Sequence, residues 1–419
     1  MKHWHLSLIV LSFILFAAPI ASADEPPTNP LNADRAMGYL EAICAIGPRV
    51  SGSRGMIEQK KLITGHFAKL GVKVEEQRFQ APHPQNRARR VRMANLVVHW
   101  RPEATRRVLL CAHYDTRPLP DQDRDPQARR NGVFIGANDG GSGTALLMEL
   151  GHLMAERFDE AAPDQDFGVD FVFFDGEELV FNDRDPYFLG SQWFATQYAK
   201  RKPLPASDGG EERVWNYDAA VLFDMVADKD LQIHFEGHSF ASRQSRPIAR
   251  EVWDVAERLG VEEFVPQVRH TVLDDHLALR QYGGIRAIDV IDFDYPYWHT
   301  TEDTPDKCSG KSLSKVRHSD FVIPIGVLAV SFFPSTIEAS TTPRRFAPMA
   351  DVKITVRKNG SLKIEGPIEL YDADGNAFPL DPSKPAIALC RCGASKNAPF
   401  CDGAHKECEF TSEVKAPVA

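Results

Sequence analysis

Five apolar segments that alternate with amphipathic helical patterns constrain the fold of this chain most. Each segment is nearly continuously apolar and rich in Val, Ile, Leu and Phe, which is typical of strands buried on both faces of a parallel sheet. The segments span residues 108–115, 169–175, 219–226, 231–235 and 287–292. Apolar residues recur with helical spacing between them, at 144–154, 191–202, 247–259 and 275–282. The sequence therefore predicts an α/β fold with a mostly parallel central sheet flanked by helices.

A glycine-rich loop follows the first of these strands. Residues 134–143 read Phe-Ile-Gly-Ala-Asn-Asp-Gly-Gly-Ser-Gly, and Asp139 stands where a helical pattern begins. The strand before the loop ends near His113. Open α/β sheets build their sites at the carboxyl ends of their strands, so we expect His113 and Asp139 to lie there together. Taken alone, Asp139 would be interpreted as a turn or cap residue.

Length and charge limit the domain count and the class of partner. A chain of 419 residues is long enough for two or three domains. The formal net charge of -9 argues against a nucleic-acid partner, and no long basic run contradicts it. The composition shifts near the C-terminus, where a short β-rich pattern ends the chain. We expect a large domain over 24–336, a linker over 337–349 and a small domain over 350–419.

The N-terminus has the pattern of a secretory signal peptide. Lys2 provides a basic start, residues 6–20 form an apolar run short for a membrane span, and 21–23 read Ala-Ser-Ala. We expect cleavage after Ala23, which removes residues 1–23 and leaves a secreted or periplasmic protein without a stable membrane span. An uncleaved membrane anchor is the alternative.

Side chains that bind metal ions fall where predicted strands end. Histidine and carboxylate ligands together suit zinc, and a site with an open coordination position is typical of catalysis. The set comprises His113, Asp139, Glu178, Asp224 and His299. Glu177, directly before Glu178, adds a carboxylate that can stay off the metal and move protons. Each residue alone also fits a structural role, such as a core histidine or a helix cap, but their shared place at strand ends favours a metal site.

This ordered set resembles the zinc aminopeptidases of the co-catalytic type and, more closely, the glutaminyl cyclases built on the same fold. The resemblance covers roughly residues 34–335. Its motifs are 47–49 (Gly-Pro-Arg), 113–115 (His-Tyr-Asp), 136–139 (Gly-Ala-Asn-Asp), 173–178 (Phe-Phe-Asp-Gly-Glu-Glu), 274–276 (Asp-Asp-His) and 297–300 (Tyr-Trp-His-Thr). The last two motifs look like the cyclase branch. The resemblance implies that residues 24–336 form a zinc-dependent catalytic domain that acts on the N-termini of peptides or proteins.

The cyclase branch implies a single zinc ion, with ligands Asp139, Glu178 and His299. By the same resemblance, Glu177 would carry a proton from the α-amine of an N-terminal glutamine to the leaving ammonia. Asp224 and Asp274 would support Glu177, and Trp298 would line the pocket. The product would be an N-terminal pyroglutamate.

The aminopeptidase branch implies two zinc ions and hydrolysis of the N-terminal residue. His113 and Asp224 would complete the second zinc site, with Asp139 bridging the two ions. All ligand types for both branches are present, so ligand identity leaves the choice open. The sequence departs from the cyclases at 182–185 (Asn-Asp-Arg-Asp), a polar run where they carry an aromatic pocket residue.

A second metal-binding pattern lies near the C-terminus. Three cysteines and a histidine could hold either one zinc ion or a two-iron two-sulfur cluster. They are Cys390, Cys392, Cys401 and His405. The segment resembles the CDGSH iron–sulfur domain, since 401–405 read Cys-Asp-Gly-Ala-His, and the predicted hairpin at 352–365, with a type I′ turn at Asn359, resembles its β region. The resemblance implies a 2Fe-2S cluster that acid destroys, because protons compete with iron for His405.

The sequence thus predicts a zinc enzyme that is most similar to the glutaminyl cyclases and carries an appended 2Fe-2S domain. An aminopeptidase on the same residues is the alternative. A further alternative is a non-catalytic or redox-sensing protein that works through the iron–sulfur domain, with a redox partner or a second copy as its partner. Export of an unfolded chain conflicts with cluster assembly in the cytosol, so zinc in the C-terminal site also remains open.

Overall fold

A computed structural model describes residues 31–161, 166–182, 184–204, 212–316, 353–365, 370, 378, 380, 384, 386–408 and 410–415. The predicted signal peptide (1–23) and linker (337–349) lie outside the described residues. Contacts divide the chain into two compact units, residues 1–335 and 336–419, and each is considered by itself. Among the described residues, no helix has the length and apolar character that crossing a membrane requires.

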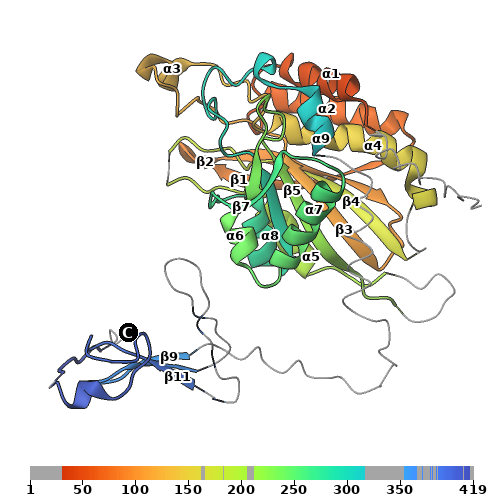
Figure 1. The fold of residues 1–419 in the computed structure, drawn as a ribbon. Helices are drawn as coiled ribbons and strands as arrows, with labels where there is room; N and C mark the ends of the chain where they lie inside the picture. The colour runs from red at the N-terminus through yellow and green to blue at the C-terminus, as the bar shows by residue number, and fades with distance from the viewer. Residues whose placement is uncertain are drawn as a thin grey trace, which may run out of the picture. The chain divides into compact units, whose positions relative to one another are not determined.

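The larger unit is built on a six-stranded sheet with the order β1-β2-β4-β3-β5-β8 (Figure 1). Four neighbouring strands are parallel: β4 (Phe167–Phe174), β3 (Arg106–His113), β5 (Asn216–Asp224) and β8 (Ala287–Ile291). β1 (Val74–His83) and β2 (Asn86–Trp100) form an antiparallel ribbon at one edge. Every residue of β4 and β8 is buried, as their continuous apolar runs require. The predicted mostly parallel sheet is confirmed.

Helices cover both faces of this sheet (Figure 1). Alternate residues of β3 point to opposite faces, so Leu110 packs in the core beneath α1 (Ala33–Cys44), α2 (Arg54–Lys69) and α4 (Gly141–Ala161). Leu109 packs on the other face, with α5 (Leu189–Ala199) and α8 (Asp275–Gly283). The remaining helices of this unit are α3 (Pro126–Asn131), α6 (Gly237–Ala241), α7 (Arg246–Arg258), η1 (Pro305–Lys307) and α9 (Gly310–Lys315).

One predicted strand does not belong to the central sheet. Residues 231–235 contain β6 (Ile233–Phe235), which pairs in parallel with β7 (Phe264–Val268) in a separate two-stranded sheet. The Phe235 ring stacks on Trp253 of α7 with the ring centroids 4.5 Å apart. An apolar run shows that a strand is buried, but it does not specify the strand with which it pairs, and this prediction was wrong for that reason.

The smaller unit contains a three-stranded antiparallel sheet with the order β11-β10-β9. Its strands are β9 (Lys353–Val356), β10 (Leu362–Glu365) and β11 (Ala386–Leu389), and η2 (Ala404–Lys406) follows them. The predicted hairpin is present, but its turn is not type I′. Val356 pairs with Leu362, which leaves five residues in the loop, and only Asn359 among them has a positive φ, of 52°. A type I′ turn needs two consecutive central residues with positive φ.

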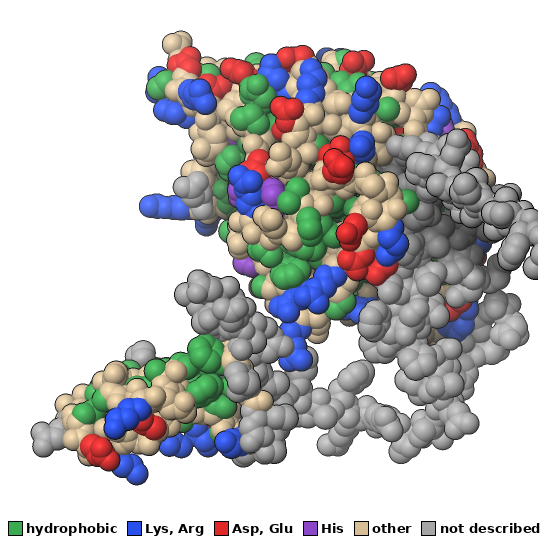
Figure 2. All heavy atoms as spheres, viewed as in Figure 1, with side chains coloured by type: hydrophobic (Ala, Val, Ile, Leu, Met, Phe, Trp, Pro, Cys, Tyr) green, Lys and Arg blue, Asp and Glu red, His purple; other side chains and the backbone are tan. Residues whose placement is uncertain are grey.

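Charged side chains on the larger unit have mixed signs. In the view of Figure 2, acidic and basic residues are interspersed with apolar ones over its face. A chain with 58 acidic and 49 basic residues can produce such a surface while it keeps a net charge of -9.

An ionic cluster lies inside the sheet, away from the carboxyl ends of the parallel strands. Asp170 of β4 is fully buried and accepts hydrogen bonds from Arg107 Nε at 2.9 Å, His99 Nδ1 at 2.7 Å and the Tyr217 hydroxyl at 2.5 Å. Although burial opposes its charge, the guanidinium of Arg107 and the His99 ring lower the pKa of Asp170 to about 2. The carboxylate is therefore charged and tied to three neighbouring strands.

We expect Asp170→Asn to destabilise the larger unit by about 3–5 kcal/mol, because it leaves the buried Arg107 without a carboxylate. The measurement is urea unfolding followed by tryptophan fluorescence, which reports on this unit because residues 336–419 contain no Trp. Asp218→Asn is the matched control, since Asp218 pairs with the half-buried Arg106, and it should cost less than about 1 kcal/mol. Equal losses in the two variants would contradict this assignment.

Candidate metal centre

The ligand-type side chains lie together at the carboxyl ends of the parallel strands. His113 is the last residue of β3 and Asp224 is the last residue of β5. Glu178 follows β4, and His299 lies in the loop after β8. Asp139 lies two residues before α4, at the mouth of that helix. Strands of one parallel sheet end at one edge, which is why residues distant in the sequence converge here.

Asp139 lies between two histidines. Its Oδ1 is 3.3 Å from His113 Nε2, and its Oδ2 is 3.3 Å from His299 Nε2. His113 Nε2 is also 3.2 Å from Asp224 Oδ1, and His299 Nε2 is 3.3 Å from Glu178 Oε1. Two groups result, each with ligand atoms within 4.8 Å of one another: His113, Asp139 and Asp224; and Asp139, Glu178 and His299. One carboxylate is shared between them, as in a bridged pair of metal sites.

The donor set fits a bound cation. Asp139 Oδ2 and Glu178 Oε2 are buried and have no hydrogen-bond partner among the residues that the structure describes. A buried carboxylate oxygen without a partner is costly unless a cation neutralises it. Both groups offer histidine nitrogen and carboxylate oxygen, the ligands that zinc accepts. The second group also carries the full set of three protein ligands typical of a catalytic zinc, with a fourth position free for water or substrate.

Charged residues around His299 and Glu178 hold these ligands in place. Arg117 is buried and donates from Nη1 to Glu178 Oε1 at 2.8 Å and from Nε to Asp121 Oδ2 at 3.0 Å. Asp121 Oδ1 in turn lies 2.9 Å from His299 Nδ1. A carboxylate on the far nitrogen of a metal-binding histidine fixes the ring orientation and raises its basicity. Arg117 and Asp121 therefore align both ligands at once.

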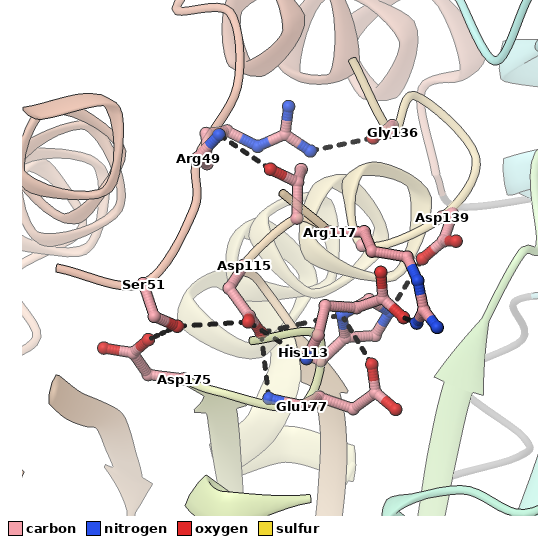
Figure 3. A network of polar contacts seen from close by, with 12 residues as sticks. Arg49, Ser51, His113, Asp115, Arg117, Gly136, Asp139, Asp175 and Glu177 are labelled. Carbon is pink, nitrogen blue, oxygen red and sulfur yellow. Dashed lines mark hydrogen bonds and ion pairs between the residues drawn. The ribbon is translucent and has the colours of Figure 1, made fainter. Parts of the chain in front are cut away.

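Two further contacts position the loop that carries Asp139. Arg49, from the Gly-Pro-Arg motif, is fully buried and donates from Nη2 to Gly136 O at 2.8 Å (Figure 3). Asp303 accepts from the backbone N–H of Asn138 at 2.8 Å and of Asp139 at 3.2 Å. These bonds fix the loop from both sides, so Asp139 can face both histidines.

A separate network holds the paired glutamates. Asp115 accepts from the backbone N–H groups of Glu177 at 3.1 Å and Glu178 at 3.0 Å. Ser51 Oγ donates to Asp175 Oδ1 at 2.6 Å and lies 3.1 Å from Asp115 Oδ2, as Figure 3 shows. The side chain of Asp115, two residues after His113, thus anchors the backbone of the Glu177–Glu178 turn.

Glu177 and its neighbours form a group of buried acids. Burial raises the pKa of Glu177 well above its ordinary value, and the charge of Glu178 adds to the effect. Burial likewise raises the pKa of Asp274, together with the charges of Asp224 and Asp275. Glu177 Oε2 is 3.8 Å from His113 Nδ1. Carboxyl groups that can hold a proton near neutral pH are suited to acid–base catalysis.

A cavity of about 300 Å³ opens onto the second ligand group. Its wall includes the predicted residues Glu177, Asp224, Asp274 and Trp298. Trp298 stacks on His299 with the ring centroids 3.9 Å apart, which places an apolar surface beside the metal ligand. The predicted site residues therefore line one cavity, and His113 lies beneath it as a buried partner of Asp139 and Asp224.

Aromatic side chains also reach the cavity from the segment after the polar run 182–185. Tyr187 and Phe188 both line the wall. Phe188 has a φ of 60°, a left-handed conformation that is uncommon for an aromatic residue and costs backbone strain. The pocket therefore contains aromatic residues although positions 182–185 are polar.

The sequence interpretation missed Arg117, Asp121, Asp115 and Asp303. Arg117 and Asp121 belong to the polar insertion at 117–133, which has no helical or strand periodicity from which a role could be predicted. Asp115 was visible as part of the His-Tyr-Asp motif, two residues after a ligand. Alternation along a strand places residues 113 and 115 on one side, and this signal could have indicated its role.

The C-terminal unit holds its four candidate ligands in two close pairs. Cys390 Sγ and Cys392 Sγ are 3.6 Å apart, and Cys401 Sγ is 3.3 Å from His405 Nδ1. Cys401 N–H donates to Ala388 O of β11 at 2.8 Å, which ties the second pair to the strand that leads into the first. Thiolate and imidazole donors of this kind fit zinc or an iron–sulfur cluster.

We expect Asp121→Asn to lower zinc affinity at the group of Asp139, Glu178 and His299 by about 10–100-fold, because His299 loses its charged partner. Competition with a chromogenic chelator measures the affinity. Asp125→Asn is the control: Asp125 lies in the same loop, is exposed and caps α3, and Asn caps as well as Asp. Unchanged affinity in the first variant would show that Asp121 does not act through the metal ligand.

Each of the two units matches the model of a known protein family. Residues 95–321 match the model of peptidase family M28, and residues 359–406 match the iron-binding zinc finger of CDGSH type. A crystal structure of glutaminyl cyclase from Fimbriiglobus ruber is similar with a TM-score of 0.62 and 40% identity, covering 73% of this chain and 97% of that one.

Two further proteins are similar at lower identity. The structure of a leucine aminopeptidase precursor from Bacteroides thetaiotaomicron has a TM-score of 0.60 and 25% identity, covering 73% of this chain and 98% of that one. The glutaminyl-peptide cyclotransferase of Gloydius blomhoffii is 25% identical over 290 residues, which are 64% of this chain and 75% of that protein. The matched family model spans more than half of the sequence, and the ligand groups lie within it, so this chain belongs to peptidase family M28.

Proposed function

We propose that the larger unit is a zinc-dependent glutaminyl cyclase, which converts an N-terminal glutamine of a peptide or protein to pyroglutamate and releases ammonia. The observation that carries this proposal is the 40% identity to the Fimbriiglobus ruber glutaminyl cyclase over nearly all of that chain, against 25% to the leucine aminopeptidase precursor. The cavity of about 300 Å³ suits one terminal residue, because it is at the lower limit of ordinary ligand pockets.

The metal site has a defined part in this proposal. Asp139, Glu178 and His299 would hold a zinc ion, which supplies Lewis acidity toward the γ-carboxamide oxygen of the substrate. The alternative group of His113, Asp139 and Asp224 would hold a second ion in an aminopeptidase. One zinc or two is therefore a further point on which the two activities differ.

The residues of the chain provide positioning and proton transfer. Trp298 and Phe188 enclose the substrate side chain and limit the access of water. Glu177 takes the proton from the attacking α-amine and gives it to the departing ammonia, so its proton count is unchanged over the reaction. Asp224 and Asp274 line the same cavity. Besides burial, the charge of Asp274, with that of Asp275, raises the pKa of Glu177 and makes its carboxylate a stronger base toward the amine. Positioned acid–base catalysis of this kind typically accelerates a reaction about 10²–10⁴-fold.

A glutamine-initiated peptide separates the proposed activities. We expect the purified protein to release ammonia without shortening the peptide, whereas a free amino acid would indicate an aminopeptidase. Glu177→Gln should lower kcat about 10²–10⁴-fold, because the proton carrier is lost. Glu257→Gln, an exposed substitution on α7, should leave the rate unchanged. Full activity of Glu177→Gln would exclude this mechanism, and no activity in the unaltered protein would favour a non-catalytic role.

We also propose that the C-terminal site holds a 2Fe-2S cluster. The match to the CDGSH type supports iron, and the arrangement of ligands in two close pairs suits one pair on each of two irons. Through this cluster the unit would exchange electrons with a redox partner or with a second copy. The domain limits proposed are 24–336 for the enzyme and 350–419 for the cluster domain, with export directed by residues 1–23.

Metal analysis tests the cluster. We expect two irons per chain in protein purified without oxygen, and a visible absorption band that bleaches on reduction. His405→Cys should retain the band to lower pH, because a thiolate replaces the imidazole that protons displace from iron. Cys408→Ser, which removes the exposed cysteine outside the four ligands, should behave as the unaltered protein. A colourless protein with zinc in this unit would contradict the proposal.

A further inference from the structure

A second and larger cavity lies on the side of the β1–β2 ribbon that faces α2. Its volume is about 730 Å³, and it shares no lining residue with the catalytic cavity. The N-terminal part of α2 contributes Met56, Ile57 and Lys60, and both strands of the ribbon contribute most of the rest of the wall, which Gly52, Tyr114 and Asp175 complete. No part of the proposed enzyme chemistry uses this space.

The register of the ribbon places several of the basic lining residues on one face. Gln80 pairs with Arg92 and Pro82 pairs with Arg90, so these positions and Arg78 lie on one face. The intervening positions, among them Phe79, Val91 and Met93, pack with Leu179 in a small apolar core on the other face. Phe79, Val91 and Met93 line the cavity as well, so its wall combines this apolar core with the arginine face.

The cavity has an excess of positive charge. Five of its lining residues are basic: Lys60, Arg78, Arg89, Arg90 and Arg92. Among the described residues that line it, the one acid is Asp175, whose carboxylate already accepts from Ser51 and from the backbone of Ala94.

Three of these cations are not neutralised by neighbours. Glu76 forms ion pairs with Lys60 at 3.0 Å and Arg78 at 2.9 Å. Within the described part of the chain, Arg89, Arg90 and Arg92 take part in no ion pair. Arg90 donates from Nη2 to Gln80 O at 2.9 Å, which holds its guanidinium against the ribbon.

The end of α2 strengthens the positive field. Met56 and Ile57 of its first turn line the cavity, and that turn contains no acidic residue. A helix of 16 residues carries partial positive charge at this end, and a hollow with apolar walls concentrates the field. The net charge of the chain is -9, so this group of cations is a local positive region that lines one cavity.

We propose that this cavity binds a ligand with two or more linked phosphate groups. Arginine supplies four of the five cations, and its planar fork binds phosphate with two parallel hydrogen bonds. Arg90 and Arg92 lie two residues apart on one strand, about 7 Å, a spacing that suits linked anionic groups better than a single one. The ligand is a soluble polyphosphate or a phosphorylated lipid headgroup, which share this chemistry.

Calorimetry of the full chain with inorganic tripolyphosphate at low salt tests the proposal. We expect one site, weakened by added salt and weakened about tenfold or more in Arg90→Ala/Arg92→Ala, since the charge-assisted hydrogen bonds of both guanidinium groups are lost. Arg87→Ala is the matched control, because Arg87 lies on the same strand but outside the cavity, and it should change affinity less than about twofold. Any heat from chelation of zinc is common to both variants.

Further measurements identify the source of the phosphate, and a conservative variant controls for misfolding. Phosphatidylcholine vesicles with a bisphosphorylated phosphoinositide should capture the chain if the ligand is a lipid, and free tripolyphosphate alone should bind if it is not. Arg90→Lys/Arg92→Lys keeps the charge and should fall between the unaltered protein and the alanine pair. Absence of binding to both probes, or binding undiminished in a folded alanine pair, would overturn the proposal.

Discussion

The concentration of buried acid at one edge of the sheet is the constraint on which the site depends. Asp139, Glu178, Glu177, Asp224 and Asp274 are all buried there, and like charges in a medium of low dielectric repel strongly. Burial opposes the charge of Asp139, but the two flanking histidines, each 3.3 Å from one of its oxygens, keep the pKa of its carboxyl far below the usual range. The orphan oxygens of Asp139 and Glu178 show that these histidines do not satisfy the site, which is therefore built for a cation.

This repulsion explains why several residues around the site hold the ligand side chains in position although they do not line the cavity. Arg49 and Asp303 hold the loop of Asp139, and Asp115 holds the backbone of the paired glutamates. Each contact joins an element close to the site with one distant in the sequence. The ends of the strands are rigid, and these hydrogen bonds fix the positions of the ligand side chains relative to them. Loss of one such contact should therefore affect metal affinity before it affects the fold.

The sequence predicted the features that depend on local patterns and motifs. It did not predict the pairing of one strand or the contacts that a long loop makes with the site. Continuous apolar runs indicated parallel strands, and residues at their ends indicated the ligands. The same kind of run misplaced 231–235, because burial does not specify a strand partner. Arg117 and Asp121 lie in an insertion without periodicity, so only the folded chain shows that they contact Glu178 and His299. Likewise, the polar run 182–185 gave no indication that Tyr187 and Phe188 would reach the pocket.

Adjacent glutamates take different roles because their surroundings differ. Burial penalises the charge of both, but His299 and Arg117 act on Glu178 and lower its pKa, so that side chain stays ionised. Glu177 has no such cation as close, since His113 Nδ1 is 3.8 Å away, and its pKa rises. Two carboxyl groups whose environments separate their pKa values divide into a permanent anion and a proton carrier. This difference supports the proposed roles, with the ionised Glu178 as the metal ligand and the protonatable Glu177 as the acid–base group, for cyclisation and for hydrolysis alike.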